Sequence, residues 1–85
     1  MTSMLERTPA QKPALSAREI EILRAWLLSE SKSEAAARLY VTAATVSTHI
    51  ARIRSKYARV GRNATTKTAL LARALQDGVI SIDEL

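Results

Sequence analysis

Cysteine and phenylalanine are absent from the 85-residue sequence, which also contains only one histidine, two glycines and two prolines. Without cysteine the chain can form neither a disulfide nor a thiolate metal site, and one histidine cannot supply a cage of metal ligands. An enzyme would need a nucleophile with a positioned base, or a glycine-rich phosphate loop, and the sequence offers neither. We therefore expect no metal, no cofactor and no catalytic residue.

Long apolar runs are missing as well. The longest is far shorter than the roughly 20 residues of a membrane span, and residues 1–7 lack the apolar segment of a secretory signal. We therefore expect a cytoplasmic protein without membrane association. The length suits one small domain, because a single core needs roughly 50 residues and a second needs about as many again. With only 4% aromatic residues, this core should form by packing helices through Leu, Ile, Val and Ala.

Acidic residues are absent from the long stretch between Ala35 and Gln76, although the whole chain has eight. The same stretch carries these basic residues: Arg38, Arg52, Arg54, Lys56, Arg59, Arg62, Lys67 and Arg73. A cationic region of this kind indicates a polyanionic partner, most often nucleic acid. The alternative reading is a basic surface that only keeps the protein soluble.

Proline and glycine divide the chain into a tail and a domain. Both prolines fall within residues 1–13, which we interpret as a flexible N-terminal tail or linker. Residues 14–85 are interpreted as the domain. No glycine or proline interrupts the chain from Ala14 to Val60, which favours helices joined by tight turns. The sequence therefore predicts an all-α fold.

Capping motifs mark the starts of four helices. They are the capping boxes Ser16 with Glu19 and Ser31 with Glu34, then Thr42, and then Thr65 or Thr66. The helices are expected to end near Leu28 or Ser29, Leu39, Tyr57 or Ala58, and Leu75. Gly78 follows the fourth helix at the left-handed position beyond its end. The pattern of residues 79–85 predicts no element.

The third helix has two unlike faces at 100° per residue. One face is apolar and is expected to be buried: Val46, Ile50, Ile53 and Tyr57. The opposite face has small side chains and lies between arginines: Ala44, Thr48, Ala51 and Ser55. The predicted elements follow the order of a helix-turn-helix unit: a longer helix, a two-turn helix, a short turn and a helix with a polar cationic outer face.

Several short motifs between Ala14 and Gln76 also follow a known pattern. They are Leu15 to Glu19 with Ile22 and Leu23, Glu34 to Ala36 with Leu39, Thr45 and Val46 with His49 and Ile53, and Lys56 and Arg62. In these residues the chain resembles the LuxR-type DNA-binding domain, which is also the output domain of NarL-like response regulators. The resemblance implies a four-helix LuxR-like helix-turn-helix domain whose third helix, about residues 43–57, enters the DNA major groove. It also implies sequence-specific binding of double-stranded DNA and regulation of transcription, by a stand-alone regulator or by an output domain.

The candidate DNA-binding residues combine this resemblance with the chemistry of the side chains. They are Lys32, Thr42, Ala44, Thr45, Ser47, Thr48, Ala51, Arg52, Arg54, Ser55, Lys56 and Arg59. Alanine and threonine methyl groups can touch a thymine methyl, and hydroxyls can bond base edges. Arg52 and Arg54 suit a bidentate guanine contact or a phosphate. Lys32 and Thr42 lie near helix starts, where amides and cations meet phosphates.

The resemblance also implies that the fourth helix forms a homodimer interface. Leu70 and Ala74 lie about 100° from Leu71 and Leu75, so these residues cannot all face one small core. Some apolar surface should remain, and Leu70 with Ala74 is the predicted dimerisation face.

Four aromatic or heteroaromatic residues are interpreted as packing residues rather than ligands. Trp26, Tyr40 and Tyr57 should pack, and His49 should lie at the core boundary. The family usually has glycine where this chain has Tyr40, and a left-handed tyrosine costs about 1 kcal/mol. We therefore expect a turn of another shape there. The rival function is a helical interaction module, or a sigma-factor-like module, that binds RNA polymerase or a partner regulator.

Overall fold

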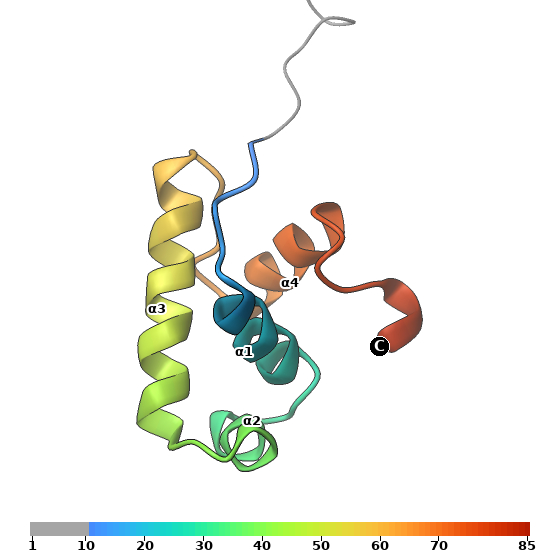
Figure 1. Cartoon of the computed structure of the whole chain (residues 1–85). Helices are drawn as coiled ribbons and strands as arrows, with labels where there is room; N and C mark the ends of the chain where they lie inside the picture. Colours follow the sequence, from blue (N-terminus) through green and yellow to red (C-terminus); the bar gives the residue numbers. More distant parts are fainter. Residues whose placement is uncertain (1–10) are drawn as a thin grey trace, which may run out of the picture.

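The computed structural model of the protein describes residues 11–85 (Figure 1). The elements are α1 (Ala17–Leu27), α2 (Lys32–Leu39), α3 (Ala43–Arg59), α4 (Lys67–Gln76) and a 3-10 helix, η2 (Ile82–Glu84). All four predicted helices are present and this part of the chain contains no strand, which confirms the all-α prediction. Residues 1–10 of the predicted tail lie outside the described residues.

The helix starts follow the capping predictions with one exception. Ser16 and Glu19 form the predicted capping box, since Ser16 N–H donates to Glu19 Oε1 at 2.8 Å and Glu19 N–H donates to Ser16 Oγ at 3.1 Å. Ser31 caps α2 as predicted, since its Oγ accepts from Glu34 N–H at 3.0 Å. The reciprocal bond of this second box is absent, because the Glu34 carboxylate accepts from Glu30 N–H at 2.8 Å instead. Of the two predicted candidates, Thr66 caps α4, and its Oγ1 accepts a hydrogen bond from Ala69 N–H at 3.0 Å.

The core lies where α1, α2 and α3 pack against one another, and in the view of Figure 1 α1 lies between α3 and α4. The predicted inner face of α3 is buried, because Val46, Ile50, Ile53 and Tyr57 are at most 1% exposed. Each such side chain stabilises the fold by roughly 1.5–3 kcal/mol relative to an exposed one. The burial of this face fixes which side of α3 points outward.

Tyr40 joins α2 to α3 in the left-handed conformation, with φ 57° and ψ 42°. The prediction of another turn shape was therefore wrong. Tyr40 N–H donates to Ala37 O at 3.4 Å and Val41 N–H to Ala36 O at 3.0 Å, the two bonds of a Schellman motif. These bonds and the packing of Val41 against the core determine the turn. The tyrosine side chain is 96% exposed, so its predicted packing role was wrong too.

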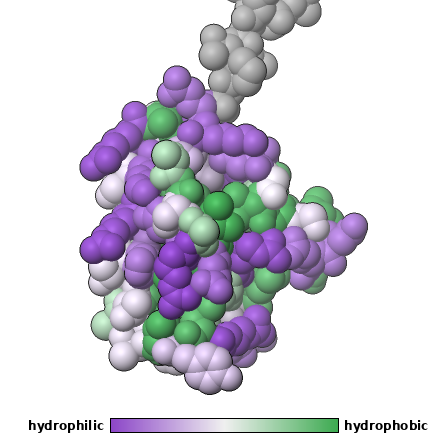
Figure 2. Space-filling model, viewed as in Figure 1, coloured by the Kyte–Doolittle hydropathy of each residue, from purple (hydrophilic) through white to green (hydrophobic). Residues whose placement is uncertain are grey.

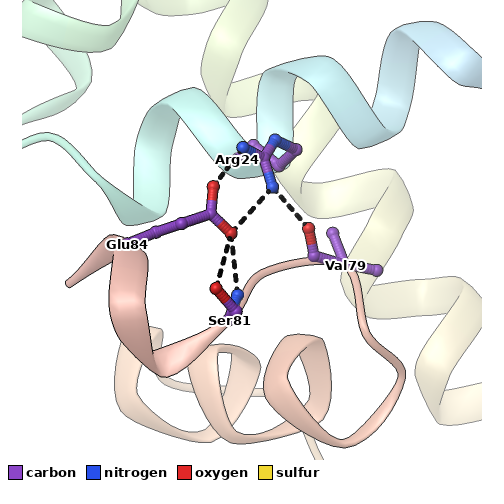
Figure 3. Close-up of polar contacts among 4 residues, drawn as sticks. All are labelled: Arg24, Val79, Ser81 and Glu84. Carbon is purple, nitrogen blue, oxygen red and sulfur yellow. Dashed lines mark hydrogen bonds and ion pairs between the residues drawn. The ribbon is translucent and has the colours of Figure 1, made fainter.

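Residues 79–85, for which the sequence predicted no element, attach to α1 (Figure 3). Ile80 is buried in the core, and Arg24 Nη1 donates to the carbonyl oxygen of Val79 at 2.7 Å. Arg24 also forms an ion pair with Glu84, which accepts from Ser81 N–H at 2.8 Å. The hydrogen bond from Arg24 lowers the pKa of Glu84 to about 2. This contact spans 60 residues of sequence, so no local pattern could have predicted it.

Candidate nucleic-acid interface

The outer face of α3 lines a hollow with a volume of about 640 Å³. In Figure 2, hydrophilic side chains gather over the side of the molecule where α3 lies. The hollow, called here the α3 hollow, is lined by Glu19, Thr48, Ala51, Arg52, Ser55, Lys56 and Arg59. All of these except Glu19 were predicted to contact DNA. The structure therefore brings six of the twelve predicted residues together on one surface.

The predicted residues at the start of α3 lie outside the α3 hollow. Thr42 Oγ1 caps the helix by accepting from Thr45 N–H at 3.1 Å, and it lies 3.0 Å from Thr45 Oγ1. Thr42 and Ala44 are exposed, and Thr45 and Ser47 are half-buried. Lys32 is half-buried in the first turn of α2. The hydroxyl of Thr42 is thus engaged in capping, and DNA contact by these residues stays a prediction.

Lys56 has an acidic partner inside the protein. Its Nζ donates to Glu19 Oε1 at 2.7 Å and to the carbonyl oxygen of Ala14 at 3.0 Å. Burial tends to raise the pKa of Glu19, but the hydrogen bonds from Lys56 and from the Ser16 amide lower it below its ordinary value. Sequence reasoning missed this role of Glu19 because the capping box already accounted for it. The α3 hollow nevertheless has more cations than acids, since Arg52 and Arg59 also line it.

Arg54 lies apart from the α3 hollow and packs on Trp26. Its guanidinium carbon is 5.4 Å from the centroid of the Trp26 ring, and its Nε is buried. Lys67 Nζ is 5.1 Å from the same centroid and donates to the carbonyl oxygen of Ser29 at 2.8 Å. Trp26 is 5% exposed, which confirms its predicted core role. The two cations stabilise the tryptophan by attraction to its ring, so they serve packing first.

Arg62 contributes to the core rather than to the cationic surface. It is 7% exposed, and its Nη1 and Nη2 each lie 2.9 Å from an oxygen of Asp77. Tyr57 donates its hydroxyl to the same carboxylate at 2.9 Å. Burial raises the pKa of Asp77, but the hydrogen bonds from Arg62 and Tyr57 outweigh it and lower the pKa. The number of basic residues between Ala35 and Gln76 therefore overestimates the positive charge that a polyanion can contact.

Leu70 and Ala74 are fully buried in the core of the chain. The prediction that they form an exposed dimerisation face was therefore wrong. Apolar residues occur around much of the circumference of α4, so their spacing does not show which of them face the core. In the structure the helix is rotated so that Leu70 and Ala74 point inward. Leu71 and Leu75 are half-buried and are the large apolar side chains that α4 leaves partly exposed.

Within residues 11–85, no cluster of three or more metal-ligating side chains occurs. No helix in the same part of the chain has the length and hydropathy required to cross a bilayer.

Three packed helices with a buried inner face and an exposed, cationic outer face on α3 define a helix-turn-helix DNA-binding domain. Residues 13–66, more than half of the chain, match the GerE family, described as bacterial regulatory proteins of the luxR family. The chain belongs to this family, whose members bind DNA and regulate transcription. No curated protein and no solved structure gives a significant match. The matched segment ends at Thr66, before α4.

Proposed function

We propose that the protein binds double-stranded DNA sequence-specifically, with α3 in the major groove. The observation that carries this proposal is the α3 hollow, because it combines small exposed side chains with three cations on the outer face of one helix. A helix of 17 residues is about 25 Å long, and the major groove is about 12 Å wide, so α3 can lie in the groove and reach the backbone at its end.

Side chains of the α3 hollow fall into two groups by size and charge. Thr48, Ala51 and Ser55 are small and exposed, so they let the helix approach the base edges. A threonine methyl or an alanine can touch a thymine methyl, while the hydroxyls can bond to polar base atoms. Arg52 and Arg59 are long, exposed cations that suit phosphates or a guanine edge. The first group would specify sequence, and the second would supply affinity.

We also infer that the domain forms a homodimer on DNA through α4, with Leu71 and Leu75 at the contact. One short helix with half-buried side chains covers well under the ~1,200 Å² of a stable complex. Dimerisation would therefore depend on DNA, as it does when two half-sites bring two domains together. The domain would act as a stand-alone regulator or as the output domain of a response regulator.

The first test is the salt dependence of binding to a pool of labelled random-sequence duplexes, followed by selection of the bound sequences. If about four to six phosphates are neutralised, log K should fall against log salt with a slope of roughly −4 to −5. A slope near zero would instead favour a module that binds RNA polymerase or a partner regulator.

Two variants then test the division between the groups. Thr48→Ala should cost on the order of 1 kcal/mol at one base position and change the preference there. Arg59→Ala should weaken binding to all sequences alike, because Arg59 is an exposed cation of the second group. A change of preference from Arg59→Ala, with none from Thr48→Ala, would contradict the assignment.

A further inference from the structure

The segment that precedes α1, residues 11–15, is held against the end of α3 (Figure 1). Lys56 Nζ donates to the carbonyl oxygen of Ala14 at 3.0 Å, and Arg62 Nη1 donates to that of Gln11 at 2.9 Å. Leu15 N–H donates to the carbonyl oxygen of Pro13 at 3.1 Å, and the proline ring restricts the backbone between them. This segment therefore has a defined position relative to α3.

A second hollow of about 320 Å³ opens between this segment and α3. It is lined by Lys12, Pro13, Ala14, Lys56, Arg59 and Val60, and it is called here the arm hollow. Lys56 and Arg59 line both hollows, so the two are continuous along the surface. Unlike the α3 hollow, whose lining includes Glu19, the arm hollow has three cations and no acid.

The acid that shares a hollow with Lys12, Asp77, is already neutralised. Lys12 and Asp77 both line a small hollow of about 170 Å³, and the charge of Lys12 contributes to the low pKa of Asp77. Asp77 is held by direct bonds from Arg62 and Tyr57, however, whereas Lys12 is exposed. The ammonium group of Lys12 therefore remains available to an anion outside the protein.

We propose that Lys12 and Arg59 form a phosphate-binding subsite that extends the DNA contact beyond α3. This inference rests on the proposed function, and it makes residues 11–15 part of the DNA-binding surface as well as a tail. Arg59 is the last residue of α3, about one helical turn beyond Ser55, where a helix in the major groove meets the phosphate backbone again. The occupant of the arm hollow is therefore a backbone phosphate, and the contact carries no sequence information.

The test is the salt slope of duplex binding for Lys12→Gln, measured by fluorescence anisotropy with the random-sequence pool. Loss of one phosphate contact should weaken binding roughly three- to tenfold near 0.1 M salt and make the slope shallower by about 1. Lys12→Arg should keep the wild-type slope. Arg38→Gln is the matched control, because it removes one positive charge from an exposed position of α2 and Arg38 lines neither hollow. Circular dichroism verifies that each variant is folded.

Two results would overturn the inference while leaving the proposed function standing. One is wild-type affinity and slope for Lys12→Gln. The other is an equal loss for Lys12→Gln and Arg38→Gln, which would mean that only net charge matters. Ethylation interference on a selected duplex adds a local readout, in which one interfering phosphate of the wild type should be silent in Lys12→Gln. A wild-type protein that binds no duplex would refute the proposed function itself.

Discussion

Tyr40 carries backbone strain that no contact of its side chain offsets. Its φ of 57° is left-handed, and the side chain is 96% exposed, so replacing it removes almost no packing. A left-handed L-residue costs about 1–2 kcal/mol, whereas glycine adopts this conformation freely. Glycine also raises the conformational entropy of the unfolded chain, which lowers the free energy of unfolding by about 0.4–1 kcal/mol. Tyr40→Gly should therefore stabilise the protein by about 0.5–1 kcal/mol.

Urea unfolding followed by Trp26 fluorescence and by circular dichroism measures this gain as a higher midpoint at an unchanged slope. Thermal unfolding should show a rise of about 2–8 °C, given about 4–8 °C per kcal/mol for a domain of this size. Tyr40→Ala is the control, because it removes the same ring and keeps the left-handed strain. The Schellman bonds come from the backbone of Tyr40 and Val41, so both variants can retain them. If Tyr40→Gly is no more stable than Tyr40→Ala, the strain argument is refuted.

Three further outcomes follow from the packed side chains. Because the pKa of Asp77 is lowered in the folded protein, its contribution to stability is complete above the ordinary value of 3.8 and is lost as pH falls through the lower folded value. Asp77→Asn should therefore remove this loss of stability at acidic pH and lower the free energy of unfolding by about 3 kcal/mol at neutral pH. Arg54→Met should change the emission of Trp26, the single tryptophan, and lower stability by about 1 kcal/mol, whereas unchanged emission would contradict the stacking. The free protein should sediment as a monomer at micromolar concentration, and Leu71→Asp should abolish the dimer on DNA; a tight free dimer that survives this change would exclude α4 as the interface.

The helices were predictable because their signals are local. Ser16 with Glu19, and Thr42, cap the helices that follow them in the sequence, and the spacing of Ile50 and Ile53 selects the buried face of α3. At Tyr40 the prediction was wrong, because it considered only the backbone strain of this residue and no interaction that could offset the strain. The hydrogen bonds to Ala36 and Ala37 and the burial of the next side chain outweigh that strain.

The outer face of α3 was predictable from helical angles alone, but the state of its cations was not. Lys56 meets Glu19 across 37 residues of sequence, and Arg54 meets Trp26 on another helix. Such pairings depend on how α1 packs against α3, which no spacing within one helix reveals. The inward face of α4 was missed for a related reason, because Leu70 and Leu71 are equally apolar and only packing decides between them.

The most direct test of the account places an acid in the α3 hollow. Ala51 is exposed on the outer face of α3, and glutamate is a good helix former, so Ala51→Glu should fold as the wild type does. Ala37→Glu is the matched control, since it adds the same charge at an exposed position of α2 outside both hollows. Measured by anisotropy with a selected duplex, Ala51→Glu should abolish binding while Ala37→Glu weakens it at most a few-fold, because only the first carboxylate is driven between the phosphates. A folded Ala51→Glu protein that binds this duplex with wild-type affinity would show that α3 does not read the DNA.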